Sequence, residues 1–366
     1  MIYIFIISVY FLLTLFVIVG FLSHPNYQLQ KTNSLIPASI IITARNEEEN
    51  IEKCLSTIAA QNFPKELIEI ILVDDGSTDA TLNKATLLFQ TSRLNYKIIQ
   101  NKKGIGKKES LKKAINESLN ELIITRDADT FTVSKEWLST IVNYHLNTKK
   151  EFIICPVAIE NDQTVLGSLQ EVETAILSLF TISSSFFKAP FLCSGANLVF
   201  TKKIFYETKA YENHLHIPSG DDVFFLEEVK ALNKNHIGYL KNRDAIVYTY
   251  PEKTIESLIE QKIRWSGKVF KSSSMLNWFS ALIIALTNFT WAWTLFYVLF
   301  SQQNALIGLF FIPAKLLIDF LLVFLAASFI KIKAKGSLVL LIGCLYPLYA
   351  SVIAILATLM KPKWKK

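Results

Sequence analysis

The chain has 366 residues, of which 51% are hydrophobic and 19% charged, and its mean hydropathy is +0.33. It is too apolar for an ordinary soluble protein, and the excess apolar residues are concentrated at the two ends. A formal net charge of +7 could indicate nucleic-acid binding. In a membrane-anchored chain it instead indicates contact with anionic lipid, and we expect no nucleic-acid partner. The four cysteines show no CxxC and no paired spacing, which predicts buried thiols rather than disulfides or zinc.

Four apolar stretches are long enough to cross a membrane. Residues 2–22 carry no charge, and a helix of that length spans ~30 Å of hydrocarbon. No basic segment precedes this stretch and no small-residue cleavage site follows it, so we interpret it as a retained anchor rather than a signal peptide. Three further stretches lie near 279–300, 305–330 and 337–360. The predicted organisation is an anchor (1–23), an α/β domain (31–250), an amphipathic interface helix (251–272) and a three-span bundle (279–360).

The basic residues predict the orientation of these spans. The first is Lys31, after the anchor, so the positive-inside rule places the amino terminus outside and the α/β domain in the cytoplasm. The lysines of 331–335 agree, whereas those of 361–366 would then lie outside, against the rule. Either the last stretch, interrupted by Gly343 and Pro347, does not fully cross, or the earlier segments fix the orientation. We therefore predict a multi-pass protein of the inner or plasma membrane and leave the side of the carboxyl terminus open.

Two strand-to-turn transitions begin the soluble part. The β-branched run 38–43 predicts a buried strand, and a polar turn then leads into an amphipathic helix over 48–60. In α/β folds, nucleotides bind at such a turn. A second strand, 68–73, ends in two aspartates that can hold ribose hydroxyls or a base edge, with Gly76 permitting the tight turn. Capping of the next helix by Ser77 or Thr78 would not explain both aspartates. The candidate nucleotide contacts are Ala44, Arg45, Asn46, Glu47, Asp74 and Asp75.

A basic turn and helix, 102–119, precede the third strand of this pattern. Such a charge run is ordinarily a solvated helix face, but here Lys107 or Lys108 lies just before a helix start and is a candidate phosphate contact. The buried strand 122–125 then runs into Asp127 and Asp129. Two carboxylates at the end of a buried strand are costly unless a cation meets them, and Asp-x-Asp suits a hard divalent cation. An isolated triplet of this kind would more simply be a polar turn.

Two further motifs follow in the second half. The small residues Gly195, Ala196 and Asn197 predict a tight turn that either lets a substrate approach the backbone or is a simple connection. Asp221 and Asp222 then precede an apolar helix, where they could merely stabilise its amino terminus or could act as a general base.

The segment 254–268 predicts an amphipathic helix just before a membrane span. Its apolar face consists of Ile255, Leu258, Ile259 and Ile263. Such a helix most simply lies at the membrane interface. Its last residues could anchor it there, or could reach into the site and contact a diphosphate. They are Gln261, Arg264 and Trp265.

Together these motifs resemble the membrane-embedded branch of the family 2 inverting glycosyltransferases, which have the GT-A fold. The matching segments are TARNEEENI (43–51), VDDGSTDAT (73–81), GKKESLKKAIN (106–116), DAD (127–129), SGAN (194–197), GDD (220–222) and QKIRW (261–265). They cover about 38–268 in the family's order. The QxxRW motif is shared by processive polysaccharide synthases and by enzymes like ceramide glucosyltransferase. The implied fold is an α/β domain with a mostly parallel mixed sheet, plus one amino-terminal and three carboxyl-terminal membrane helices.

The resemblance also implies roles for residues. It implies a nucleotide-sugar donor, by default a UDP-sugar, with Asp75 and the turn 44–47 at the nucleoside. It implies a divalent metal, Mg²⁺ or Mn²⁺, at Asp127 and Asp129, and a catalytic base at Asp222 supported by Asp221. The implied reaction is a single displacement with inversion.

The acceptor is the least determined part. The carboxyl-terminal spans carry two clear ionisable residues, Lys315 and Asp319, which most simply pair with each other at i and i+4. An extrusion pore needs a polar lining, so we favour transfer of one sugar to a membrane-resident lipid or lipid-linked acceptor. The alternatives are a processive synthase resembling chitin or hyaluronan synthases, and a non-catalytic membrane scaffold, against which the intact acidic motifs argue.

Overall fold

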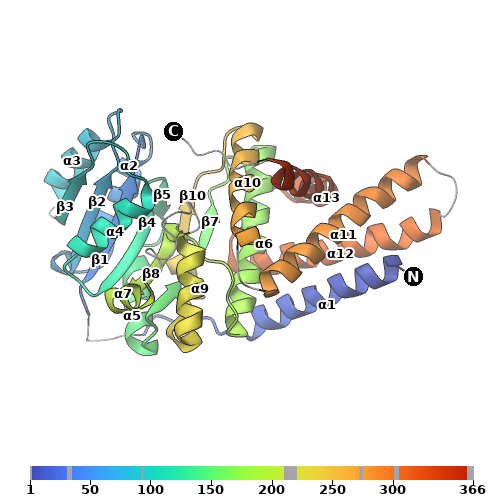
Figure 1. Cartoon of the computed structure of the whole chain (residues 1–366), viewed down its shortest axis with the longest axis horizontal. Coiled ribbons are helices and arrows are strands. Elements are labelled where there is room, and N and C mark those ends of the chain that lie inside the picture. Colours follow the sequence, from blue (N-terminus) through green and yellow to red (C-terminus); the bar gives the residue numbers. More distant parts are fainter. Residues whose placement is uncertain are drawn as a thin grey trace. The chain divides into compact units, whose positions relative to one another are not determined.

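A computed structural model describes residues 2–30, 35–92, 94–209, 221–271, 275–300 and 305–360 (Figure 1). The chain divides into two compact units, each built from separate stretches of sequence. The α/β unit consists of His24–Ala158 and Lys188–Tyr250. The helical unit consists of Met1–Ser23, Ile159–Phe187 and Pro251–Lys366.

The α/β unit is built on a mixed sheet. Over the described residues its strand order is β3-β2-β1-β4-β8-β6-β9. Strands β3, β2, β1 and β4 are parallel, β8 runs antiparallel to both β4 and β6, and β9 is parallel to β6. The strands are β1 (Ala38–Ala44), β2 (Ile68–Asp74), β3 (Asn95–Gln100), β4 (Leu122–Asp127), β6 (Phe152–Ile154), β8 (Leu198–Thr201) and β9 (Ile237–Tyr239). The mostly parallel mixed sheet expected from the sequence is confirmed.

Helices cover this sheet, and a smaller sheet of order β5-β10-β7 adjoins it. The helices are α2 (Ile51–Ala59), α3 (Thr81–Ser92), α4 (Lys107–Glu117), α5 (Trp137–Thr148), α7 (Lys202–Thr208) and α9 (Asp221–Asn233), with short 3-10 turns at Lys65–Leu67, Gly195–Asn197, Lys234–His236 and Arg243–Ala245. The strands of the smaller sheet are β5 (Thr130–Thr132), β7 (Val157–Ile159) and β10 (Val247–Thr249).

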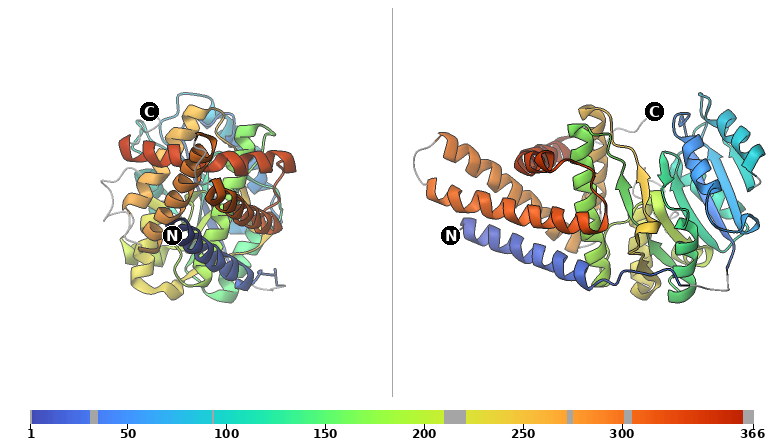
Figure 2. Two further views of the ribbon diagram at one scale, coloured as in Figure 1. Left: turned by 90° about the vertical axis from the view of Figure 1, so that its right-hand side faces the viewer. Right: turned by 180° about the vertical axis from the view of Figure 1, so that it is seen from behind.

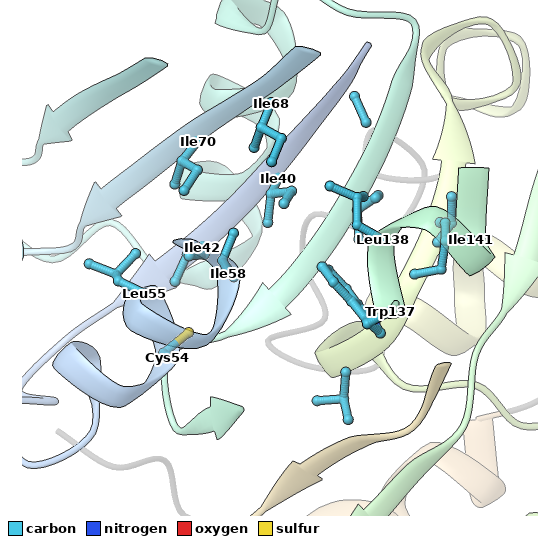
Figure 3. Packing of buried hydrophobic residues seen from close by; sticks show 14 of the residues in the cluster. Ile40, Ile42, Cys54, Leu55, Ile58, Ile68, Ile70, Trp137, Leu138 and Ile141 are labelled. Carbon is cyan, nitrogen blue, oxygen red and sulfur yellow. The ribbon is translucent and has the colours of Figure 1, made fainter. Parts of the chain in front are cut away.

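The apolar runs form strands because both faces of the sheet are covered, as in parallel sheets generally. Ile40 and Ile42 of β1 are fully buried beside Ile70 of β2, and the predicted apolar stripe of α2 packs on them through Leu55 and Ile58 (Figure 3). The same cluster continues to the indole of Trp137 on α5. This core holds the strand ends rigid at the edge where the polar turns lie.

Strand register brings the polar turns to one edge of the sheet. Ala44 of β1 pairs with Asp74 of β2, and Thr43 pairs with Asp127 of β4. Because these strands are parallel, their carboxyl ends meet at one edge, where α/β folds bind ligands. Asp74 and Asp127 are the last residues of their strands, one and two residues beyond the ends that the apolar runs predicted.

The helical unit contains five helices that are long and apolar enough to cross a membrane, among the described residues. They are α1 (Ile2–Ser23), α6 (Val165–Phe186), α11 (Met275–Phe300), α12 (Ala305–Phe329) and α13 (Gly336–Leu359), and they are joined by α10 (Ile255–Lys271). The four expected apolar stretches are confirmed as helices. Figure 2 shows α1, α11 and α12 running alongside one another, and all three pairs are in contact.

Helix α6 is the fifth, and the sequence analysis did not identify it. Its amino-terminal half carries Gln170, Glu171 and Glu173, which interrupt the apolar pattern. Ser168, Gln170 and Glu171 are buried, and the helix begins where the Thr164 hydroxyl accepts a hydrogen bond from the Gly167 amide at 2.9 Å.

Small residues allow α1 to pack closely on α6. A Cβ atom at Gly20 would come within 2.7 Å of the Ser183 Cα atom, so no larger residue fits there without movement. The Ser183 hydroxyl donates to the Val17 carbonyl at 2.6 Å. Close approach of backbones at small residues is the usual way membrane helices associate.

Helix α12 contains the predicted ion pair between Lys315 and Asp319, which the structure confirms. The Tyr10 hydroxyl of α1 donates to the other oxygen of Asp319 at 2.6 Å. The pair is therefore a contact between α1 and α12 within the helical unit. On α10, Leu258 and Ile263 are buried as expected, whereas Ile255, assigned to the same face, is 68% exposed.

Candidate active site

The turns after β1 and β2 are joined to each other by hydrogen bonds. Asn46 has the left-handed φ of +55°, which asparagine tolerates. Its backbone N–H donates to the Ser77 hydroxyl at 3.0 Å, and its side-chain oxygen accepts from the Thr78 N–H at 2.9 Å. Ser77 and Thr78 thus join the two turns, and α3 begins three residues after Thr78, at Thr81. The Thr81 N–H donates to the Asp79 carboxylate at 3.0 Å.

Asp75 uses its carboxylate within the protein. It accepts hydrogen bonds from the N–H groups of Ile105 and Gly106, each at 2.9 Å, and from the side chains of Asn101 and Ser110 at 3.0 and 3.1 Å. Burial alone would raise the pKa of Asp75, but these four donors hold that pKa below its usual range. Asp75 thus fastens the basic turn before α4 to the end of β2.

Its neighbours occupy distinct places at the same edge. Asp74 is 1% exposed, and one of its oxygens accepts from the Ser77 N–H at 3.3 Å. The Arg45 guanidinium lies against Gly104, where an added Cβ would come within 2.7 Å of Arg45 Nη1. Glu47 accepts from the Asn50 side chain at 2.8 Å.

The DAD segment presents two carboxylates in this region. Asp127 forms an ion pair with Lys107, the first residue of α4. Asp129 accepts from the Thr249 hydroxyl at 3.3 Å. Burial, and then the nearby negative charges of Asp127 and Glu47, raise the pKa of Asp129 to about 7.

These residues fit a divalent cation that is also held by substrate. Burial and then the neighbouring carboxylates Asp127 and Glu47 disfavour the negative charge of Asp129, which a bound cation would offset. Among the residues that the structure describes, no three His, Cys, Asp or Glu side chains come together as a complete metal cage. Two aspartates with open positions are the ligand set with which Mg²⁺ binds phosphate-containing substrates. Asp127 and Asp129 would be the protein ligands.

Arg126 and Thr130 brace the DAD turn, and the sequence analysis assigned them no role. Arg126 is 1% exposed, and its guanidinium lies 4.8 Å from the Trp137 ring centroid. Its Nε donates to the Thr130 hydroxyl at 3.0 Å, and that hydroxyl donates to the Asp127 carbonyl at 2.6 Å. The available signal was a charged residue inside an otherwise buried strand.

The Gly195 turn connects the DAD region to the acidic residue of α9. The Gly195 N–H donates to the Asp222 carboxylate at 3.2 Å, and its carbonyl accepts from the Thr125 hydroxyl at 2.8 Å. A Cβ at Gly195 would lie 3.9 Å from the Lys107 ammonium nitrogen. Asp222, Gly195, Lys107 and Asp127 are therefore consecutive neighbours.

The other two residues of this turn face inward. Ala196 is buried, and Asn197 is fully buried. The Asn197 amide donates to the carbonyls of Pro156 and Ala245, both at 2.8 Å, and accepts from the Trp137 indole at 3.2 Å. In this structure Asn197 supports the turn from behind.

The remaining assigned residues lie elsewhere. Gly220 and the side chain of Asp221 are outside the described part of the chain. Gln261, Arg264 and Trp265 lie on α10 of the helical unit. There the Gln261 side chain donates to Glu252 at 3.0 Å.

The family model described as Glycosyl transferase family 2 matches residues 39–208, which include every strand-end turn of this site up to Asn197. Residues 39–208 are a family 2 glycosyl transferase domain. The matched range carries the DAD segment, whereas Asp222 and the QKIRW segment lie beyond it.

Curated proteins similar to this chain include two bacterial synthases. It is 23% identical over 233 residues to the poly-beta-1,6-N-acetyl-D-glucosamine synthase of Staphylococcus epidermidis, covering 62% of this chain and 53% of that protein. It is 23% identical over 264 residues to the synthase of the same name from Staphylococcus aureus strain COL, covering 71% and 60%. The chain thus matches little more than half the length of these relatives.

A solved structure with the same fold is the mannosyltransferase PcManGT from Pyrobaculum calidifontis, in complex with GDP-Man and Mn²⁺. The TM-score is 0.58 at 12% sequence identity, and the match covers 97% of this chain and 95% of that one. At this identity the likeness shows the fold alone. The expected GT-A fold, with apolar helices at both ends of the chain, is confirmed.

Proposed function

We propose that this chain is a membrane-embedded inverting glycosyltransferase that moves a sugar from a nucleotide-sugar donor to an acceptor hydroxyl. The observation that carries the proposal is the linkage of the Asp222 carboxylate to the Gly195 N–H, beside the Lys107–Asp127 ion pair. A base and a phosphate-binding region are thereby neighbours at the carboxyl edge of the sheet. UDP is the default nucleotide of the family and nothing in the chain distinguishes it further.

In the proposed reaction, Asp222 accepts the proton of the acceptor hydroxyl as that oxygen attacks the anomeric carbon. The Gly195 N–H donates to one Asp222 oxygen at 3.2 Å and the Val223 N–H donates to the other at 2.9 Å, and these two hydrogen bonds orient the carboxylate. The turn 44–47 and Asp74 border the nucleoside, and Asp75 acts by holding the basic turn in place. Lys107, which forms an ion pair with Asp127, would bind a phosphate of the donor instead when the donor is present.

A divalent cation bound by Asp127 and Asp129 would offset negative charge on the diphosphate leaving group. Arg264 and Trp265 are proposed, from the QKIRW motif, to contact the diphosphate and the acceptor. Support for the cation comes from the position of Asp129, whose pKa is raised first by burial and then by the nearby charges of Asp127 and Glu47.

The decisive variant is Asp222→Asn. We expect kcat for sugar transfer to fall about 10²- to 10⁴-fold, the usual contribution of a general base, while the donor Kd changes little. Transfer would be measured with radiolabelled nucleotide sugars in lipid, and donor binding by calorimetry. The matched control is Glu66→Gln, since Glu66 is exposed before β2, at the opposite end of that strand. Loss of donor binding in Asp222→Asn would indicate that Asp222 serves the donor and that another residue is the catalytic base.

The proposed acceptor is a membrane-resident lipid or lipid-linked glycan that receives one sugar. Support comes from the five helices, among the described residues, that are long and apolar enough to cross a membrane. The transfer assay distinguishes single transfer from polymer synthesis by the size of the product. A single shifted glycolipid spot on thin-layer chromatography, lost with EDTA, supports transfer of one sugar to a lipid.

A second candidate is processive polysaccharide synthesis. The relatives from Staphylococcus carry the name of a polysaccharide synthase. Helix α11 also buries a polar face, which the sequence analysis overlooked: Asn277, Ser280, Thr287, Asn288 and Thr294. A ladder or high-mass product in the same assay would establish this candidate, and silence with every donor would favour a scaffold.

A further inference from the structure

A buried ion pair fixes α10 to α6 within the helical unit. Lys262 Nζ lies 2.5 Å from Glu173 Oε2, and the two side chains are only 7% and 13% exposed. Lys262 is the second residue of the QKIRW segment. Helices α6 and α10 lie side by side in Figure 1, and the pair joins them beside that segment.

The same ammonium group also touches the tryptophan of the motif. Lys262 Nζ lies 4.3 Å from the centroid of the Trp265 ring, which is three residues further along α10. A cation over an aromatic face is attractive, so Lys262 links the Glu173 carboxylate to the orientation of the indole. Trp265 is otherwise 37% exposed.

Glu173 is itself held in place by a third helix. Its other oxygen accepts from the Tyr346 hydroxyl of α13 at 3.3 Å. The segment just before α10 is held on α6 by two further hydrogen bonds. The Gln170 side chain accepts from the Glu252 backbone N–H at 2.8 Å and donates to the Glu252 carbonyl at 3.1 Å. Glu173 is therefore the point at which α6, α10 and α13 meet around the QKIRW segment.

A buried ion pair is a poor device for stability alone, because desolvation of both charges offsets their attraction. An apolar pair of similar volume would hold two helices equally well. What the charged pair adds is a defined position for the ammonium group, and hence for the ring above which it lies.

We propose that Glu173 is a positioning residue for the QKIRW segment: through Lys262 it fixes the ring of Trp265 and the helical turn that carries Arg264. This deepens the proposed function and rests on it, because the value of a fixed Trp265 and Arg264 is their contact with substrate. Glu173 acts through Lys262 and is not itself a catalytic residue.

The test compares Glu173→Gln with the neutral double variant Glu173→Gln/Lys262→Met, in the full chain reconstituted in lipid. Three properties are measured: the unfolding temperature, kcat for transfer, and the ¹⁹F resonance of Trp265 after labelling the six tryptophans with 5-fluorotryptophan. Trp265→Phe assigns the resonance by its disappearance. Glu256→Gln, an exposed position on the same helix, is the matched control.

In Glu173→Gln we expect a lower unfolding temperature, a shifted or broadened Trp265 resonance and kcat reduced about 10- to 100-fold, as for other misplaced contacts. In the double variant the unfolding temperature recovers because no unpaired charge stays buried, whereas the resonance and kcat do not recover.

Two results would overturn the proposal: an unchanged Trp265 resonance in Glu173→Gln, or transfer that recovers together with stability in the double variant. If the wild-type chain transfers no sugar from any donor, the proposed function fails. The resonance still decides whether Glu173 orders Trp265, so the two failures are distinguishable.

Discussion

The carboxylate of Asp75 accepts hydrogen bonds from the basic turn before α4 and thereby holds that turn at the end of β2. In Asp75→Asn one of the two carboxylate oxygens, which accept from the N–H groups of Ile105 and Gly106, is replaced by an NH₂ donor, so one of these two hydrogen bonds is lost. We expect the free energy of unfolding of the α/β unit to fall by about 1–3 kcal/mol, the cost of leaving buried groups unsatisfied. Faster amide hydrogen exchange at 104–106 would locate the change to this turn.

The same variant has a pH signature. The pKa of Asp75 is lower in the folded chain than in the unfolded chain, so its stabilising effect is complete above the unfolded pKa of about 3.9 and is lost as pH falls through the folded pKa. The stability difference between wild type and Asp75→Asn should therefore be full at neutral pH and shrink toward zero in acid. A difference independent of pH would contradict this role.

Thr130 offers a second test beside the DAD segment. Thr130→Val keeps the shape of the side chain but removes both the partner of Arg126 Nε and the hydrogen bond to the Asp127 carbonyl. We expect stability to fall by about 1–2 kcal/mol and Mn²⁺ to bind more weakly, measured by thermal unfolding and by electron paramagnetic resonance titration. Thr86→Val, on α3, is the control. Unchanged Mn²⁺ affinity with lower stability would show that the brace serves folding only.

For single residues, the sequence predicts where on a strand or turn a residue lies better than it predicts the direction in which its side chain points. Asp127 and Asp129 at a strand end were predictable, because apolar runs locate strands and parallel strands share an edge. The inward direction of Asn197 was not, since its partners Trp137, Pro156 and Ala245 are distant in sequence.

Among the elements, the contact between α1 and α6 gives the sharpest prediction. In Gly20→Val the branched side chain would meet the backbone of Ser183, 2.7 Å from an added Cβ. We expect overpacking to cost about 1–3 kcal/mol and to lower the yield of monodisperse protein in detergent. Val19→Leu, on an exposed face of α1, should change neither yield nor melting temperature.

The helix that the sequence analysis missed shows why hydropathy alone was insufficient. Glu171 and Glu173 in the first half of α6 break the apolar run, so 165–186 was absorbed into the second half of the α/β domain. Their charges are tolerated because Glu171 accepts hydrogen bonds from the backbone N–H groups of Lys333 and Ala334, and because Glu173 forms an ion pair with Lys262. Partners that far away leave no local signal.

At the scale of the whole molecule, the positive-inside rule predicts that the α/β unit lies in the cytoplasm. In a background lacking native cysteines, a membrane-impermeant maleimide should label Lys102→Cys only after the membrane is opened. Residues 301–304, between two apolar stretches, hold no Lys or Arg, so the positive-inside rule favours the outside for them, and Gln302→Cys should be labelled in intact cells. The reverse pattern would place the α/β unit outside.

Both units are discontinuous in the chain, and this has a consequence for how the protein is made. Glu171 emerges from the ribosome 162 residues before Lys333, whose backbone N–H donates a hydrogen bond to it. Glu173 meets its partner Lys262 once α10 is made, whereas Glu171 gains its partners only when the segment after α12 is synthesised. The maturation of α6 is therefore a late event, and the interval before it is when membrane chaperones and proteases have access to an incomplete bundle.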